Sequence, residues 1–136
     1  MTTPQWVYVI ESGRLLGANG LLAVGYSGHD EGVNNPGLCN APNVGPIPHG
    51  RWSVLPPRNP VDHLGPLALP LVPVEGTATF GRSGFLIHGD TLEDVQHCWR
   101  NASHGCIILP RAARAAVAAV PDSTLRVLGY DREVSQ

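Results

Sequence analysis

Apolar residues along this chain occur in short runs that are separated by glycine and proline, a pattern typical of a mainly β protein. The runs are rich in β-branched, aliphatic and aromatic side chains, and turn-forming residues end most of them. This pattern predicts short strands at residues 6–11, 14–17, 21–26, 51–55, 67–72, 77–80, 84–88 and 125–128. The pair Ser12-Gly13 predicts a hairpin turn between the first two strands, and Pro70 predicts an edge strand or a bulge.

Two segments show helical rather than strand character. Residues 110–120 begin with proline, continue as an alanine-rich run and stop at Pro121, which predicts a helix. Residues 91–99 predict a second, shorter helix, since Thr91 is a suitable N-cap. One or two short helices among many strands indicate a single mainly β domain over residues 1–136, either a β-sandwich or a partly closed barrel.

A long segment rich in proline and glycine, residues 29–50, lies between the third and fourth predicted strands. Loops of this length in compact domains are often functional or cover an active site. We expect His29, Asp30 and His49 within it to be solvated or turn residues rather than catalytic ones.

Composition and charge narrow the class of protein. Apolar residues make up 43% of the 136 residues and charged residues 15%, which indicates a folded globular chain. The net charge of −2 argues against nucleic acid or an anionic membrane as a partner. No apolar run approaches the ~20 residues of a membrane span, so we expect no membrane insertion. The first residues lack the features of a signal peptide, and synthesis in the cytoplasm without one is expected.

The residues that indicate chemistry lie in two stretches, His88-Gly89 and Ser103-His104-Gly105-Cys106. A cysteine beside a strand, with histidines that can be folded onto it, is the minimum for nucleophilic thiolate catalysis. His88 ends a predicted strand, so the sheet would fix its position, and it is the better candidate for the base than His104. Gly105 allows close approach of the backbone, and amides around Cys106 are suited to stabilise an oxyanion.

Other interpretations of the cysteines stay open. Cys106 can be a buried structural thiol, or it can bind a metal together with His97, Cys98 and His104. Adjacent ligands at 97 and 98 do not match the usual zinc spacing, and we expect no metal and no cofactor. Cys39 and Cys98 either form a disulfide in an oxidising compartment or remain partly buried thiols.

These motifs resemble a known family. His88-Gly89, with the histidine 18 residues before the cysteine of Ser103-His104-Gly105-Cys106, resembles the signature of L,D-transpeptidases, which have the YkuD-like fold. Further stretches resemble the compact Tlde1-like branch of type VI secretion effectors. They are Gly25-Tyr26-Ser27-Gly28, Asn34-Asn35-Pro36, Gly45-Pro46-Ile47-Pro48-His49-Gly50 and Gly105-Cys106-Ile107-Ile108-Leu109. The resemblance extends from about Trp6 to about Leu128.

The resemblance implies roles for individual residues. Cys106 would be the nucleophile, His88 the base and the Gly89 carbonyl the group that orients the imidazole, with Asp90 as a rival. His104 would line the oxyanion region or orient its loop. Residues expected at the substrate, by hydrogen bonding or by contact with a peptide carboxylate, are Ser103, Gly105, Asp90, Arg82 and Arg100; both arginines can equally be solvated. Ile108 departs from the arginine or asparagine of the wider family, although the effector branch shares an apolar residue there.

The implied function is an antibacterial enzyme that cleaves the terminal D-alanine from peptidoglycan tetrapeptide stems through a cysteine thioester. Water as the acceptor would make it an L,D-carboxypeptidase, and an amine would make it a transpeptidase. The implied partners are the stem peptides, a cognate immunity protein and the secretion machinery, and the implied place of action is the periplasm of a target bacterium. A cysteine amidase or endopeptidase on another wall amide, and a non-catalytic wall-binding or partner-binding module, are the alternatives.

Overall fold

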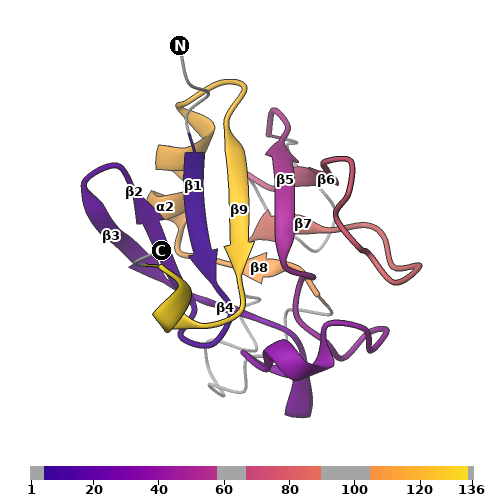
Figure 1. Cartoon of the computed structure of the whole chain (residues 1–136). Coiled ribbons are helices and arrows are strands. Elements are labelled where there is room, and N and C mark those ends of the chain that lie inside the picture. Colours follow the sequence, from indigo (N-terminus) through magenta and orange to yellow (C-terminus); the bar gives the residue numbers. More distant parts are fainter. Residues whose placement is uncertain (1–4, 58–66, 90–104, 135–136) are drawn as a thin grey trace.

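The computed structural model describes residues 5–57, 67–89 and 105–134, and strands dominate it (Figure 1). Nine strands form one sheet in the order β3-β2-β1-β9-β5-β6-β7-β8-β4. Their bounds are Gln5–Val9 (β1), Arg14–Gly17 (β2), Gly20–Val24 (β3), Tyr26–Ser27 (β4), Gly50–Val54 (β5), Leu69–Pro73 (β6), Leu86–His88 (β7), Ile107–Ile108 (β8) and Thr124–Leu128 (β9). The sheet curls into a nearly closed barrel, which confirms the predicted mainly β fold.

Neighbouring strands run antiparallel except in two pairs, β1 with β9 and β7 with β8, which are parallel. The hairpin predicted between the first two strands is present, and Val9 pairs with Arg14 at its closed end. Its turn is longer than the predicted two residues, since residues 10–13 lie between the paired Val9 and Arg14. The Gly13 N–H donates to the Val9 carbonyl at 2.8 Å and closes this turn.

The strand predicted over 21–26 divides into β3 and β4 at Gly25. The Gly25 N–H donates to the Gly13 carbonyl at 2.8 Å, and a Cβ at this position would collide with the carbonyl of Ile108. The chain therefore changes direction at a residue that must be glycine, since the backbone of Ile108 occupies the space of a side chain. As a result β3 lies at one end of the strand order and β4 at the other, beside β8.

Two further predictions about strands are wrong. β6 is an internal strand, not an edge, because its first residues pair with β7 and its last residues with β5, and Pro70 lies where the partner changes. Residues 77–80 form no strand, since the Thr77 hydroxyl donates to the Arg51 carbonyl at 2.9 Å and accepts from the Arg51 N–H at 3.0 Å. A side chain there satisfies backbone groups that a further strand would otherwise pair with.

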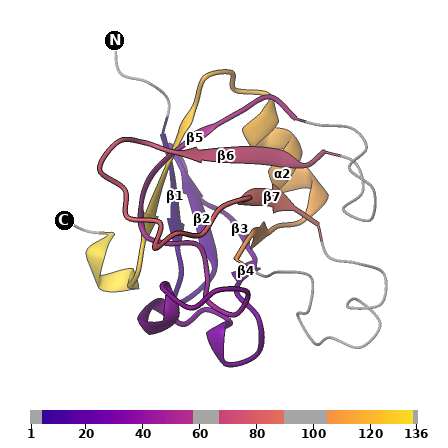
Figure 2. The ribbon, with the colours of Figure 1, turned by 90° about the vertical axis from the view of Figure 1, so that its right-hand side faces the viewer.

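The helix predicted over 110–120 is confirmed as α2, Arg111–Ala118, which lies behind β6 and β7 in Figure 2. Its buried face carries Ala113, Arg114 and Val117. Among the described residues, the other helical elements are single 3-10 turns at Asp30–Gly32 (η1), Pro36–Leu38 (η2) and Asp131–Glu133 (η4). The second predicted helix, residues 91–99, lies outside the described residues.

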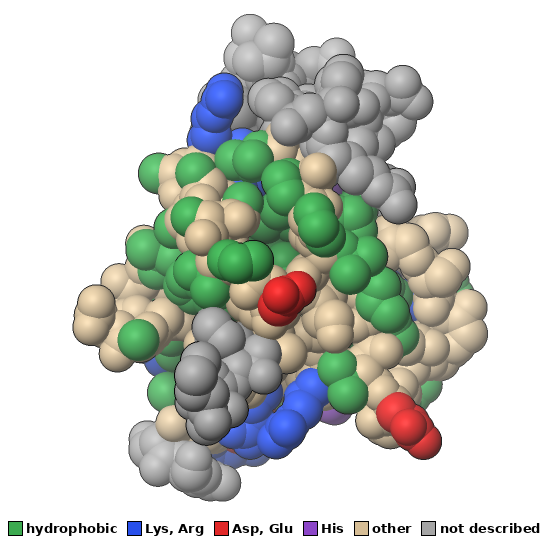
Figure 3. All heavy atoms as spheres, turned by 90° about the horizontal axis from the view of Figure 1, so that it is seen from above, with side chains coloured by type: hydrophobic (Ala, Val, Ile, Leu, Met, Phe, Trp, Pro, Cys, Tyr) green, Lys and Arg blue, Asp and Glu red, His purple; other side chains and the backbone are tan. Residues whose placement is uncertain are grey.

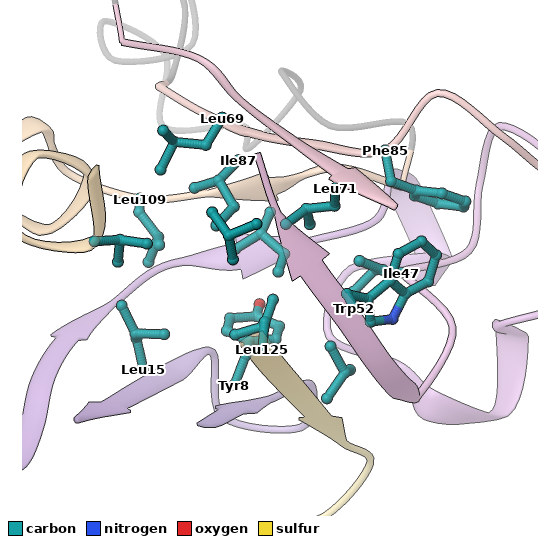
Figure 4. Packing of buried hydrophobic residues seen from close by; sticks show 14 of the residues in the cluster. Tyr8, Leu15, Ile47, Trp52, Leu69, Leu71, Phe85, Ile87, Leu109 and Leu125 are labelled. Atoms are coloured by element: carbon teal, nitrogen blue, oxygen red, sulfur yellow. The ribbon is translucent and has the colours of Figure 1, made fainter. Parts of the chain in front are cut away.

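The core fills the inside of the curled sheet (Figure 4). It is built from one apolar cluster that includes Tyr8, Leu15, Ile47, Trp52, Leu69, Leu71, Phe85, Ile87, Leu109 and Leu125. The rings of Trp52 and Phe85 meet edge to face, with centroids 5.1 Å apart. Ile87 of β7 and Ile107 of β8 are opposite one another in register and both are fully buried. The face of these two strands that carries both isoleucines therefore packs in the core.

A second apolar feature lies at one end of the barrel. A hollow of about 110 Å³ lies between the end of β5 and the C-terminal end of α2, and its lining includes Leu55, Pro56, Val117 and Pro121. Figure 3 shows hydrophobic side chains gathered over this end of the molecule. Within the described ranges, no helix is long and apolar enough to cross a membrane.

Candidate active site

The two halves of the sequence motif are brought together by the parallel pairing of β7 and β8. Ile87 is opposite Ile107 and His88 is opposite Ile108. Because side chains alternate along a strand, His88 lies on the face opposite to the buried Ile87. The same alternation places Cys106, the residue before β8, on the face opposite to Ile107. His88 and Cys106 therefore share one face of this strand pair, two positions apart in register.

The imidazole of His88 is held in one tautomer. Its side chain is buried, with 2% of its surface exposed, and Nδ1 lies 2.9 Å from the carbonyl oxygen of Gly89. A carbonyl oxygen only accepts, so Nδ1 carries a proton, and in the neutral imidazole the lone pair is then on Nε2. The His88 carbonyl accepts from the Leu109 N–H at 3.0 Å, which joins the two strands just beyond the site. Of the two ring nitrogens, Nε2 is therefore the one that can act as a base.

Cys106 is partly exposed, and its sulfur lies 3.7 Å from the carbonyl oxygen of Gly84. Burial raises the pKa of its thiol, while a backbone hydrogen bond at Leu86 and the positive charge of Arg82 act in the opposite direction without cancelling the increase. The thiol is therefore mainly protonated at neutral pH. A thiol in this state needs a base before it can act as a nucleophile.

Cys106 opens into a cleft with a volume of about 330 Å³, within the range of small-ligand sites. The cleft is formed by the loop between β6 and β7 and by the long segment after β4. Figure 2 shows this long segment at the lower end of the molecule. Its lining residues are Pro42, Asn43, Phe80, Gly81, Arg82, Ser83, Gly84, Phe85 and Cys106. The long segment over residues 29–50, expected to be functional, therefore contributes one wall of this cleft.

The peptide between Gly105 and Cys106 is fixed by a buried serine that the sequence did not indicate. The Ser27 hydroxyl donates to the Gly105 carbonyl at 3.2 Å and accepts from the Ile47 N–H at 2.9 Å. The N–H and C=O of a trans peptide point in opposite directions, so the Cys106 N–H is directed away from Ser27. In the sequence, Ser27 belongs to the stretch Gly25-Tyr26-Ser27-Gly28 that resembles the effector branch, but nothing there indicated a role for its hydroxyl.

Gly105 itself has no room for a side chain. Its φ is +131°, and a Cβ would lie 2.5 Å from Nη2 of Arg82 and 2.9 Å from Cε1 of Phe85. The glycine is therefore required both by its backbone conformation and by the guanidinium packed against it. Gly89, beside His88, is similar in the second respect, because a Cβ there would lie 2.8 Å from Nη2 of Arg114.

Arg82 lies at the site but uses its guanidinium on the protein backbone. Nη1 donates to the carbonyls of Cys39 at 2.6 Å and Pro46 at 2.8 Å, and Nη2 donates to the carbonyl of Gly45 at 2.8 Å. Its Cζ also lies 5.1 Å from the ring centroid of Phe85. The contact with a substrate carboxylate expected from the sequence stays a prediction.

Several of the sequence-based candidates lie outside the described residues: Asp90, Arg100, Ser103 and His104, as well as His97 and Cys98 of the metal alternative. Cys39, the other half of the possible disulfide, is a free buried thiol, with Sγ 3.8 Å from Nδ1 of His49. In the part of the chain that is described, no group of three or more His, Cys, Asp or Glu side chains is arranged to hold a metal ion.

Comparison with known families gives one match, and it covers the site. The model of the Tlde1 domain matches residues 22–124, a segment that contains both His88 and Cys106. A comparison with curated proteins found no match. Because the matched segment is well over half of the chain, the protein belongs to the Tlde1 domain family.

Proposed function

We propose that this protein is an antibacterial cysteine enzyme of the L,D-transpeptidase kind that acts on peptidoglycan stem peptides. The observation that carries the proposal is the shared face of β7 and β8, where a histidine with Nε2 as its basic atom lies two register positions from a cysteine that lines a cleft. Membership of the Tlde1 domain family supports the same class of reaction and an effector role in type VI secretion.

The proposed first half-reaction forms an acyl-enzyme. A tetrapeptide stem binds in the cleft with the carbonyl carbon of its third residue at the sulfur of Cys106. Nε2 of His88 takes the thiol proton, and sulfur attacks the carbonyl carbon to form a tetrahedral oxyanion that backbone amides near Cys106 stabilise. The C–N bond to the terminal D-alanine breaks, and His88 returns the proton to the leaving amine. A thioester remains on Cys106.

The second half-reaction releases the acyl group to an acceptor. Water attacks the thioester carbon in the L,D-carboxypeptidase reaction, and the amine of a D-amino acid or of a second stem attacks it in the transpeptidase or exchange reaction. His88 accepts the proton of the attacking group, and the sulfur leaves and is reprotonated. The steps balance with the side chains and the substrate alone, so they call for no metal or cofactor.

The raised pKa of the Cys106 thiol decides how His88 acts in this scheme. A thiol that is mainly protonated at neutral pH makes proton transfer to His88 part of the reaction, instead of a thiolate that is present beforehand. The Gly89 carbonyl accepts from Nδ1–H throughout, so the imidazolium formed during catalysis stays oriented.

The proposed biological role is that of a toxin that is delivered by a type VI machine and is active in the periplasm of a competitor. It implies a cognate immunity protein in the producing cell and a loading partner in the secretion machinery. These partners are proposed from the family. The assay described below identifies the acceptor of the acyl group.

The test is incubation of the purified protein with tetrapeptide muropeptides, followed by mass spectrometry. We expect tripeptide product or an exchanged D-amino acid from the native enzyme, and neither from Cys106→Ala or His88→Gln. Cys39→Ala removes the other described thiol, which does not line the cleft, and is expected to retain activity. Unchanged tetrapeptide from folded, reduced native protein would refute the proposed reaction.

The same assay separates the alternatives. A cysteine amidase or endopeptidase would leave the terminal D-alanine in place and cut another wall amide, which gives fragments of different mass. A non-catalytic binding module would leave every muropeptide intact, and Cys106→Ala would remain toxic when it is directed to the periplasm of a sensitive cell.

A further inference from the structure

Arg82 connects three separate segments at the candidate site. Its side chain extends from the loop between β6 and β7 and donates three hydrogen bonds to carbonyls of the segment 39–46. One face of the guanidinium lies against Phe85, whose ring packs on the core residue Trp52. Nη2 lies where a side chain of Gly105 would be. One side chain therefore joins two walls of the cleft and the turn that carries Cys106.

The three hydrogen-bond acceptors of Arg82 described above are uncharged. The three carbonyls replace water around the guanidinium, but each is neutral, so they solvate the charge without cancelling it. Burial lowers the pKa of the Arg82 guanidinium, and the charges that Cys39 and Cys106 would carry as thiolates act in the opposite direction. An arginine remains protonated in proteins, so this site keeps a fixed cation.

The charge is placed where a thiolate would need it. Cys106 feels the positive charge of Arg82, and His88 is the titratable side chain that shares its strand face. In a partly desolvated cleft the Coulomb interaction between a cation and an anion a few ångströms apart is several times stronger than in water. A cation held against Gly105, the residue before Cys106, therefore favours the anionic states of the reaction over the neutral thiol.

We propose that Arg82 is a positioning residue for Cys106: it fixes the Gly105–Cys106 turn against the segment 39–46 and stabilises negative charge on the sulfur. This inference rests on the proposed role of Cys106 as the nucleophile. It assigns to Arg82 a role toward the enzyme's own reactive group and not toward a substrate carboxylate.

The test measures the reactivity of Cys106 without any peptidoglycan substrate. Native protein, Arg82→Gln, Arg82→Lys and the control Arg126→Gln, which removes an exposed charge on β9, are alkylated with iodoacetamide from pH 6 to pH 10. Mass spectrometry of the Cys106 peptide gives the rate at each pH. Because no turnover is required, the result is independent of whether the proposed muropeptide reaction is observed.

The expected result is specific to the charge of Arg82. Arg82→Gln should slow alkylation of Cys106 at pH 7 roughly tenfold, since a loss of this interaction raises the thiol pKa by about one unit. Arg82→Lys keeps the charge but not the fork of donors, so we expect much of the native rate together with a lower Tm. Arg126→Gln should match the native profile. Equal profiles for Arg82→Gln and Arg126→Gln would overturn the proposal.

A second pair of variants keeps the proposal testable if Arg82→Gln does not fold. Cys106→Asp and Cys106→Asn have similar shapes and leave Arg82 in place. At pH 8, above the usual titration range of histidine, a carboxylate at position 106 should be stabilised by Arg82, so Cys106→Asp should melt at or above Cys106→Asn. A Tm for Cys106→Asp well below that of Cys106→Asn would overturn the proposal.

Discussion

Replacing Ser27 by alanine tests whether the Gly105–Cys106 peptide is held by a single buried hydroxyl. Ser27 is fully buried, and its Oγ both donates to the Gly105 carbonyl and accepts from the Ile47 N–H. Ser27→Ala removes both bonds and leaves the buried N–H of Ile47 without this acceptor. An unsatisfied buried donor costs about 1–3 kcal/mol and the lost bond to Gly105 about 1 kcal/mol, so we expect a loss of roughly 2–4 kcal/mol in the free energy of unfolding.

This loss is large enough to measure by thermal unfolding. For a chain of 136 residues, an unfolding entropy of about 2.1 cal/mol/K per residue means that 1 kcal/mol shifts Tm by about 3–4 °C. Ser27→Ala should therefore lower Tm by roughly 7–14 °C. Turnover of muropeptide, measured well below the new Tm, should fall as well, because the peptide that precedes the nucleophile loses its support.

The matched control is Ser123→Ala. Ser123 is also buried, with 2% of its surface exposed, but its hydroxyl has no hydrogen-bond partner in the structure as described. Removing an unsatisfied hydroxyl should leave Tm unchanged or raise it slightly. If the two variants lowered Tm by the same amount, the hydrogen bonds of Ser27 would not be the cause, and the explanation given for the position of Cys106 would be refuted.

Two further predictions concern backbone strain and acid stability. Gly105→Ala should lower Tm and abolish turnover, since it combines an unfavourable φ of +131° with a Cβ 2.5 Å from Arg82. The control Gly76→Ala, with φ +95° and nothing within 4 Å of its Cβ, should lower Tm by less and leave turnover unchanged. Equal effects of the two variants on Tm and on turnover would contradict the packing argument. The pKa of Asp131 is lowered: burial acts to raise it, but the hydrogen bonds from Ser12 and Arg14 and the charge of Arg14 outweigh that effect. A carboxylate with a lowered pKa stabilises the fold above its unfolded-state pKa and loses that contribution as pH falls through its folded-state pKa. Asp131→Asn should therefore lower the free energy of unfolding by about 1 kcal/mol at pH 7 and leave it unchanged at a pH below the folded-state pKa. A Tm difference between the two proteins that is independent of pH would contradict this.

The pattern of apolar runs determined most strands and the one described helix, because these elements depend on side chains close together in the sequence. Pro110 and Pro121 bracket α2, and β7, Leu86–His88, lies within the strand predicted over 84–88. The errors occurred where distant groups intervene. The Ile108 backbone leaves no room for a side chain at Gly25, so one predicted strand became two, and the hydroxyl of Thr77 satisfies backbone groups of Arg51 in place of a further strand.

The candidate residues could also be predicted from the sequence, since His88 and Cys106 belong to one motif, and the family match over residues 22–124 includes both positions. The sequence alone did not show how they meet. The parallel register of β7 and β8 decides that the two residues lie two positions apart, and register depends on pairing between segments that are distant in the chain.

Only the tertiary structure revealed the residues that hold the site in place. Ser27 and Arg82 act on Gly105 across 78 and 23 positions of sequence, and neither has a neighbour whose identity would signal that role. A hydroxyl and a guanidinium are common on protein surfaces, so their types alone indicate little. Their function here follows from burial and from the backbone carbonyls that they reach, and both are consequences of how the sheet closes.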